Sequence, residues 1–245
     1  MRVLVTGGTA RLGPSVVRRL RDAGCTVRVL SRRPPADASY VQGDLRSGVG
    51  LDAAVRDIDT VIHCASSPNR DPELTRNLLA ALGSRPAVRI LYVSIVGIDR
   101  VNMMYYRGKL ASEQLIMSSG LQWTIQRATQ FHQLILGAAR PLSRLPVVPV
   151  PRDLRLQPVA ADDVAARLVE ITLAGDTGRM PDMAGPHVRT FEELVRAYLR
   201  QRERRRPVLP IWLPGLATVR AGGLLPSGDH RTGSTTWEDF LTSSS

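Results

Sequence analysis

The first 135 residues alternate short apolar runs with longer amphipathic segments. Runs rich in Val, Ile and Leu have the length of strands, and we predict strands at residues 2–7, 26–31, 40–42, 60–65, 89–94 and 123–128. The segments between them repeat apolar residues at helical spacing, which predicts helices at residues 14–23, 73–82 and 105–118. Strands that alternate with helices favour βαβ units, so we expect an α/β fold with a doubly wound parallel sheet.

The pattern changes beyond Gln130. Prolines interrupt residues 141–158, and the stretch PVVPVP within them is expected to be extended chain. The proline-rich run that starts at Pro207 is expected to fold over a pocket without regular structure. We therefore divide the chain into residues 1–135 and a smaller C-terminal lobe, residues 136–245, integrated into one globular unit.

Two helices are predicted in this second region. Asp162 is expected to cap a helix that runs to about Ala174. Thr190 and Glu193 have the spacing of a capping box for a helix that ends near Arg202.

Composition limits the partners of the chain. A net charge of +11 is compatible with nucleic acid, but the densest basic run, Arg202 to Arg206, has no interleaved aromatic residues and no recognition motif is present. No apolar run approaches the roughly 20 residues of a membrane span, and a strand begins at Arg2 where a signal peptide would lie. Cys25 and Cys64 lack metal-type spacing. We expect a cytoplasmic protein without metal, nucleic-acid or membrane partners, and a small anion as a ligand.

A glycine-rich loop follows the first predicted strand. The sequence TGGTARLG contributes Thr6, Gly7, Thr9, Ala10, Arg11, Leu12 and Gly13. Glycines permit a tight turn there, and the N-terminus of the following helix offers N–H groups and a positive dipole end to a pyrophosphate. We expect this loop to bind a dinucleotide. Ala10 occupies the position of the middle glycine, which puts the affinity in question.

The end of the second strand indicates which dinucleotide is bound. Proteins that prefer NAD usually carry an acidic residue there, which accepts hydrogen bonds from the ribose 2′-hydroxyl. This chain has Ser31, Arg32 and Arg33 instead, and Arg11 is a further candidate for the same phosphate. Guanidinium groups suit a 2′-phosphate, so NADP (NADPH) is favoured. The alternative for Arg32 and Arg33 is two solvated charges in a turn.

Further motifs follow in a recognisable order: GDL at residues 43–45, HCASS at 63–67, YVS at 92–94 and Y-x-x-x-K at 105–109. With the glycine loop, they resemble the short-chain dehydrogenase/reductase superfamily, in particular its atypical, NmrA-like NAD(P)H-binding subgroup. The resemblance implies a Rossmann-like fold in which residues 1–135 bind the dinucleotide and residues 136–245 bind the substrate.

The resemblance also implies roles for single residues. Asp44 corresponds to the aspartate at the adenine edge, with Leu45 beside the ring, and Ala65 and Ser66 correspond to residues against the adenosine ribose. Ser94, Tyr105 and Lys109 correspond to the catalytic serine, tyrosine and lysine. Lys109 is also expected to bind the ribose of the nicotinamide.

The chemistry of reduction needs these residue types. Hydride transfer to a carbonyl carbon leaves an alkoxide that requires a proton, and a tyrosine beside an ammonium is a better acid-base group than tyrosine alone. Lys109 is the only lysine of the chain and lies four residues after Tyr105, on the same helical face. Two alternatives stay open: Tyr106 is the acid, or Lys109 merely pairs with Glu113.

The substrate side is less specific. Phe131, His132 and Trp212 are candidates for substrate contacts, and Met103, Met104 and Leu213 for an apolar wall. We predict an NADPH-dependent reductase of a small apolar carbonyl or a related double bond. The alternatives are a non-catalytic NADP-binding sensor or scaffold, and a nicotinamide-dependent epimerase.

Overall fold

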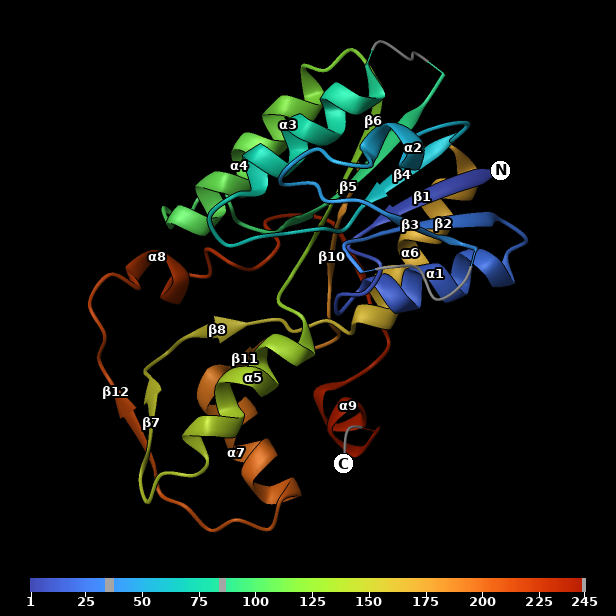
Figure 1. The fold of residues 1–245 in the computed structure, drawn as a ribbon. Helices are drawn as coiled ribbons and strands as arrows, with labels where there is room; N and C mark the ends of the chain where they lie inside the picture. Colours follow the sequence, from blue (N-terminus) through green and yellow to red (C-terminus); the bar gives the residue numbers. More distant parts are fainter. Residues whose placement is uncertain (34–37, 84–86, 244–245) are drawn as a thin grey trace. The chain divides into compact units, whose positions relative to one another are not determined.

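The structure, a computed structural model, describes residues 1–33, 38–83 and 87–243 (Figure 1). The chain forms two compact units that interleave along the sequence. The first unit comprises Met1–Ser94, Asn102–Arg127 and Val164–Met180, and the second comprises Ile95–Val101, Ala128–Asp163 and Pro181–Ser245. The predicted division into residues 1–135 and 136–245 concerns function and stays a prediction.

The first unit is built around a parallel sheet. Its strands lie side by side in the order β6 (Gln122–Ala128), β5 (Arg89–Ile95), β4 (Thr60–His63), β1 (Arg2–Thr6), β2 (Thr26–Ser31) and β3 (Tyr40–Gln42), and β9 (Gly178–Arg179) pairs with β6. Val5 of β1 pairs with Val29 of β2 on one side and with Ile62 of β4 on the other. All three side chains are buried, as expected of a sheet that is covered on both faces.

Helices cover the two faces of this sheet. Figure 1 shows α3 (Asp71–Leu82) and α4 (Met104–Met117) on one face, and α1 (Gly13–Asp22) with most of α6 (Ala161–Ala174) on the other. The short α2 (Leu51–Ala54) contacts α3. This arrangement confirms the predicted α/β fold with a doubly wound parallel sheet.

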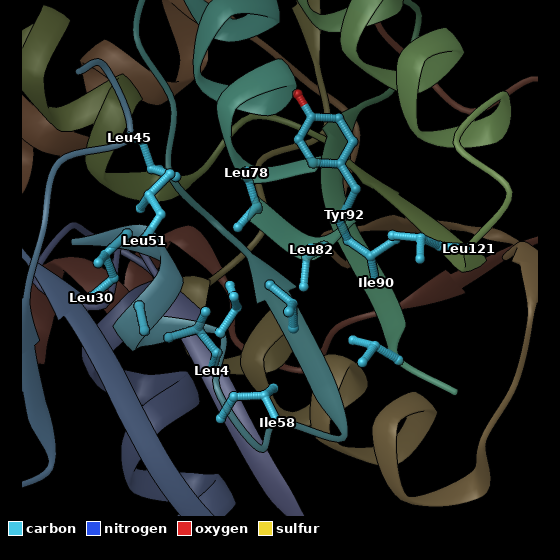
Figure 2. Packing of buried hydrophobic residues seen from close by; sticks show 14 of the residues in the cluster. Leu4, Leu30, Leu45, Leu51, Ile58, Leu78, Leu82, Ile90, Tyr92 and Leu121 are labelled. Carbon is cyan, nitrogen blue, oxygen red and sulfur yellow. The ribbon is translucent and has the colours of Figure 1, made fainter. Parts of the chain in front are cut away.

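Apolar side chains from the sheet and from α3 form one buried cluster (Figure 2). Leu4 of β1 and Ile90 of β5 belong to it together with Leu78 and Leu82 of α3, each with no measurable exposure. Tyr92 stands at the edge of the cluster, and its hydroxyl points away from the apolar side chains. Each buried leucine contributes roughly 1.5–3 kcal/mol, so the core fixes the position of α3 firmly.

The second unit consists of short elements. They are α5 (His132–Leu142), β7 (Val148–Pro151), β8 (Arg155–Leu156), β10 (Asp182–Ala184), β11 (Arg189–Thr190), α7 (Phe191–Gln201), β12 (Val208–Ile211), α8 (Ala217–Arg220), β13 (His230–Thr232) and α9 (Trp237–Ser243). Strand β10 pairs with β13, β7 with β12, and β8 with β11. Helices α5 and α9 both pack on α7, and Trp237 Nε1 donates a hydrogen bond to the Leu194 carbonyl at 3.0 Å.

The structure confirms one predicted helix start beyond Gln130 and corrects two other expectations. Thr190 and Glu193 form the expected capping box. Helix α6 begins at Ala161, which places Asp162 inside its first turn and not at the cap. Helix α5 ends where the expected proline interruptions begin, because Pro141 falls in its last turn, where it interrupts few hydrogen bonds. The run after Pro207 is also regular, because β12 pairs with β7.

Among residues 1–33, 38–83 and 87–243, no helix combines the length and the apolar character that crossing a bilayer requires.

His63, at the end of β4, makes the stability of the first unit depend on pH. Its Nδ1 lies 2.7 Å from Thr6 Oγ1 and its Nε2 lies 3.3 Å from Thr75 Oγ1, so β1, β4 and α3 meet at one imidazole. Burial, assisted by the Lys109 ammonium, lowers the pKa of His63 to about 3. The folded protein therefore keeps this imidazole neutral at pH values where the unfolded chain protonates it, below about 6.5.

We predict that lowering the pH from 7.5 to 5 destabilises the wild-type protein more than a His63→Asn variant. The difference should be about 2 kcal/mol, because each pKa unit between the unfolded and folded values is worth about 1.4 kcal/mol. Urea unfolding of both proteins at the two pH values measures it. Equal losses in the two proteins would show that His63 does not titrate in this way.

Candidate functional site: a dinucleotide cavity with a Tyr-Lys pair

The cavity of the first unit lies where the order of its strands reverses. Strand β1 has β2 on one side and β4 on the other. The chain adds β2 and β3 on one side of β1 and then continues on the other side with β4, β5 and β6. The carboxyl ends of β1 and β4 diverge at such a point and leave a crevice, which is the usual ligand site of an open parallel sheet.

The glycine loop between β1 and α1 forms the floor of this crevice. Gly7 has a φ of +70°, and a Cβ at this position would lie 2.6 Å from the Ala65 amide nitrogen. A Cβ at Gly13, the first residue of α1, would collide with the Gly7 carbonyl. The Ala10 amide donates a hydrogen bond to the same carbonyl at 2.9 Å, and the Ala10 side chain is exposed. Gly7 therefore lets the loop pack closely against the segment after β4, Gly13 lets α1 begin close to Gly7, and Ala10 fits the turn.

A cavity of about 490 Å³ opens above this loop. This is within the range of small-molecule sites, roughly 300–1,000 Å³. Nine of the predicted cofactor residues line it: Gly7, Thr9, Ala10, Ser31, Arg32, Asp44, Leu45, Ala65 and Ser66. Among the other predicted residues of the loop, Thr6, Leu12 and Gly13 are buried, and Arg11 is exposed.

Arginines gather at the end of β2. Arg32 lines the main cavity and also a neighbouring cavity of about 420 Å³, which it shares with Arg33, Thr9 and Ser31. Among residues 1–33, 38–83 and 87–243, no carboxylate lines the smaller cavity. The two guanidinium groups therefore lie beside a space that opens on the glycine loop.

Two further lining residues, Gly43 and Ser67, belong to the GDL and HCASS motifs, and the sequence assigned no site role to Leu30, Arg46, Pro68, Arg70 and Leu74. Arg46 directly follows GDL, and Pro68 directly follows HCASS. Asn77 of α3 was missed as well; its side-chain amide donates to the carbonyls of Leu45 and Arg46 at 2.8 and 2.9 Å. Extending these two motifs by two residues includes Arg46 and Pro68 but not Arg70, Leu74 or Asn77.

Tyr105 is connected to the wall of this cavity. Its hydroxyl lies 3.1 Å from Ser66 Oγ, and Ser66 lines the cavity. Tyr106 is half-buried, and burial raises the pKa of its phenol to about 12. A phenol of such weak acidity is poorly suited to proton transfer, and the contact with Ser66 favours Tyr105 for this role.

Asp71, the first residue of α3, joins the two predicted catalytic side chains. Its carboxylate accepts a hydrogen bond from Ser66 Oγ at 3.0 Å and another from the Ser67 amide. The same carboxylate lies 3.4 Å from Lys109 Nζ, and the two side chains are only 2% and 5% exposed. The path from the Tyr105 phenol to the Lys109 ammonium therefore runs through Ser66 and Asp71.

Lys109 is held by three kinds of contact. Besides the ion pair with Asp71, Nζ donates a hydrogen bond to the Val93 carbonyl at 3.4 Å and lies 4.8 Å from the centre of the Tyr92 ring. Burial lowers the pKa of Lys109, but Tyr92 and Asp71, assisted by Tyr105, raise it by more, so the net direction is upward. Burial raises the pKa of the Tyr92 phenol, which stays neutral, and the full counter-charge comes from Asp71. The ammonium is therefore charged at neutral pH.

The alternative pairing of Lys109 with Glu113 is not observed. Glu113 binds Arg127 of β6 instead, with Oε1 2.8 Å from the guanidinium Nε and Oε2 2.7 Å from Nη2. This pair is 3% and 5% exposed and anchors the middle of α4 to the sheet. The helix that carries Tyr105 and Lys109 is thereby fixed in rotation.

The remaining predicted catalytic residue, Ser94, lies at the end of β5. It is 2% exposed, and its hydroxyl has no hydrogen-bond partner among the described residues. Its neighbour Val93 accepts the hydrogen bond from Lys109, so the serine is adjacent in the chain to the carbonyl that holds the lysine.

The predicted substrate residues belong to the second unit. His132 is fully buried, its Nε2 lies 3.1 Å from the Pro158 carbonyl, and its ring contacts Trp237 and Phe240. Phe131 bridges to Val159. Trp212 is 67% exposed, with the Arg220 guanidinium over its ring. His132 thus packs in an aromatic core, whereas Trp212 is available to a ligand.

Comparison with known proteins identifies the family. Residues 7–174 match the model of a family described as NAD(P)H-binding. The chain belongs to this NAD(P)H-binding family. Membership agrees with the predicted likeness to NmrA-like short-chain dehydrogenase/reductases, and the matched residues include the glycine loop, Asp71, Tyr105 and Lys109.

Two curated relatives of the family cover most of the chain. A (4-alkanoyl-5-oxo-2,5-dihydrofuran-3-yl)methyl phosphate reductase of Streptomyces griseus is 32% identical over 200 residues, which are 78% of this chain and 70% of that protein. An uncharacterized protein of Mycobacterium tuberculosis is 30% identical over 231 residues, 89% of this chain. The chain spans about a quarter of the length of the mycobacterial relative.

Solved structures share the fold of this family member. The NADPH-dependent quinone oxidoreductase QOR2 of Escherichia coli, in complex with NADPH, superposes with a TM-score of 0.82 and covers 98% of this chain and 99% of its own. The two sequences are 18% identical, so the comparison concerns the fold.

We predict that Glu113→Gln destabilises the first unit by roughly 3 kcal/mol, because it leaves the buried Arg127 guanidinium without its carboxylate. Asp22→Asn is the matched control in the same unit. It breaks the Arg18–Asp22 pair, whose side chains are 58% and 67% exposed, and should cost less than about 1 kcal/mol. Urea unfolding of the two variants checks the difference, and comparable losses would show that the Glu113–Arg127 pair adds nothing through its burial.

Proposed function

We propose that the protein is an NADPH-dependent reductase that transfers a hydride to a small apolar carbonyl compound or to a conjugated double bond. One observation carries the proposal: the Tyr105 phenol is hydrogen-bonded to Ser66, a residue of the dinucleotide cavity wall. An acid-base group is therefore connected to the cavity, beside a charged lysine. A protein that only binds a dinucleotide needs the cavity but does not need a hydrogen bond between its wall and a tyrosine.

The residues present fit a dinucleotide with a 2′-phosphate. Close approach of the Gly7 loop to Ala65 leaves the cavity open above the start of α1, where N–H groups favour a pyrophosphate. Asp44 and Leu45 line the same cavity at the end of β3, and Arg32 supplies positive charge at the end of β2. NADPH supplies the hydride when it is bound, and the roles of the protein are binding, orientation and proton supply.

Each predicted catalytic residue has a distinct role in this proposal. The Tyr105 hydroxyl gives its proton to the oxygen that becomes negative as the hydride arrives, and water returns a proton to the phenolate. Lys109 keeps a positive charge near the phenol and so favours the phenolate during that step. Ser94, whose buried hydroxyl has no hydrogen-bond partner in the described part of the chain, donates a hydrogen bond to the substrate oxygen.

The relatives narrow the substrate class. The name of the Streptomyces relative describes the reduction of an alkanoyl butenolide phosphate, and the fold neighbour is a quinone oxidoreductase. Both kinds of substrate place a carbonyl in conjugation with a double bond. We propose a conjugated carbonyl for this chain, with the exposed Trp212 and Leu213 as candidates for apolar contacts.

We predict that Arg32→Ala weakens NADPH binding roughly 10-fold or more and leaves NADH binding nearly unchanged, because a charge-assisted contact to the 2′-phosphate is worth about 1.5–3 kcal/mol. Arg56→Ala is the control, since it removes an exposed arginine of the same unit that does not line the cavity. Fluorescence titration with the two cofactors measures both affinities. An equal loss for NADPH and NADH would contradict the assignment of Arg32 to the 2′-phosphate.

We predict that Lys109→Arg lowers kcat for NADPH-dependent quinone reduction on the order of 100-fold, because a planar guanidinium cannot reproduce the contacts of the ammonium and displaces the pair. Arg107→Lys, the reverse exchange at an exposed position of α4, should retain full turnover. NADPH oxidation at 340 nm follows turnover, and circular dichroism with NADPH titration reports folding and binding. Wild-type activity in Lys109→Arg would show that the lysine has no role in the mechanism. If the wild-type protein binds NADPH but reduces no conjugated carbonyl, the result would favour the alternative function, a non-catalytic NADP-binding sensor.

A further inference from the structure

A buried carboxylate outside the predicted catalytic set contacts both Lys109 and the cavity-wall loop that carries Ser66. Asp71 is 3% exposed and is the first residue of α3, a helix of 12 residues. One of its oxygens accepts the Ser66 hydroxyl and pairs with Lys109, and the other accepts the Ser67 amide. A side chain that only capped its own helix would bind amides of α3, whereas these partners come from the loop after β4 and from α4.

We propose that Asp71 is a positioning residue for reduction: it holds the Lys109 ammonium and, through Ser66, orients the Tyr105 phenol at the edge of the dinucleotide cavity. The inference rests on the reductase function proposed above, and it adds a residue that neither the Tyr-Lys motif nor the glycine loop contains.

The direction of the hydrogen bonds supports this role. Ser66 has one hydroxyl proton, and it donates that proton to Asp71. In the contact between Ser66 and Tyr105, the phenol must therefore be the donor. The carboxylate thus determines, through one intervening hydroxyl, where the proton of Tyr105 points.

The charges around Lys109 support it as well. Five titratable groups face the ammonium: Asp71 from α3, Tyr92 from β5, Tyr105 from α4, and His63 and Cys64 from β4 and its following loop. Burial lowers the pKa of His63 to about 3 and raises that of Cys64 to about 12, so both are neutral at physiological pH. Burial also raises the pKa of Tyr92. Among the described groups that face Lys109, the carboxylate is therefore the one that balances its charge.

The single lysine of the chain makes the proposal directly measurable. Protein labelled with ¹⁵N and ¹³C in lysine alone gives one side-chain signal, that of Lys109. We expect Asp71→Asn to lower the pKa of Lys109 by one to three units, because burial then acts on the ammonium without an opposite charge nearby. Asp52→Asn, in the first turn of α2, removes an exposed carboxylate and should leave the signal unchanged. An unchanged pKa of Lys109 in Asp71→Asn overturns the proposal.

Turnover supplies a second, separate readout. In Asp71→Asn, kcat for quinone reduction should fall at least about 10-fold, KM and NADPH affinity should change by less than about threefold, and the alkaline limb of the kcat profile should move to lower pH. Asp71→Glu, which retains the charge, should restore the position of that limb. A loss of stability without a shift of the limb would mean a structural role and overturn the proposal.

The two readouts separate the two proposals. If the wild-type protein reduces no substrate, the proposed function fails, while the lysine signal still decides whether Asp71 holds Lys109. If Asp71→Asn does not fold, the Lys109 signal of the wild-type protein tests the proposal. A buried, paired ammonium gives a ¹⁵N–¹H signal that persists at neutral pH. An ammonium signal lost to rapid solvent exchange contradicts the proposal.

Discussion

The ion pair between Asp71 and Lys109 is the contact on which the geometry of the site depends. A buried charge is tolerated only when an opposite charge and hydrogen bonds replace the water it has lost. The carboxylate meets this requirement with a lysine, a hydroxyl and a backbone amide, and the position of Asp71 in the first turn of α3 adds the favourable end of the helix dipole. Because these partners come from the loop after β4 and from α4, satisfying one buried charge on α3 fixes three segments together.

Helix α3 connects this site to the hydrophobic core. One face of the helix places Leu78 and Leu82 in the buried cluster, and its side chains Asp71 and Asn77 hold the loops that follow β4 and β3. The same rigid element thus determines the core and two walls of the dinucleotide cavity. A change in the packing of the helix would move both walls, so stability and cofactor binding are coupled in this unit.

Patterns in the sequence predicted those features that depend on residues close together in the chain. Alternating apolar runs identified the strands of the sheet, and the Thr190–Glu193 spacing identified a capping box, because each depends on residues a few positions apart. The glycine loop located the cavity for the same reason. Pairings between distant segments were missed. Strand β12 is regular only because β7 pairs with it. In the sequence, Asp71 is an ordinary acidic residue at the start of a helix, and only the fold brings Lys109 within 3.4 Å of it. The partner of Glu113 was likewise invisible, since Arg127 lies on a strand 14 residues away.

Two cation sites associated with α4 explain why this arginine-rich chain keeps one lysine. Glu113 presents both carboxylate oxygens to Arg127, and a planar guanidinium matches that arrangement with two parallel hydrogen bonds. The groups around Lys109 are a carboxylate oxygen of α3, a carbonyl of β5 and the face of an aromatic ring, so they do not form the paired acceptors of one carboxylate. A compact ammonium with three rotatable donors satisfies such a set, whereas a guanidinium directs its donors within one plane. The choice of lysine therefore follows from the shape of the site, and the shape of the site follows from the position of Asp71.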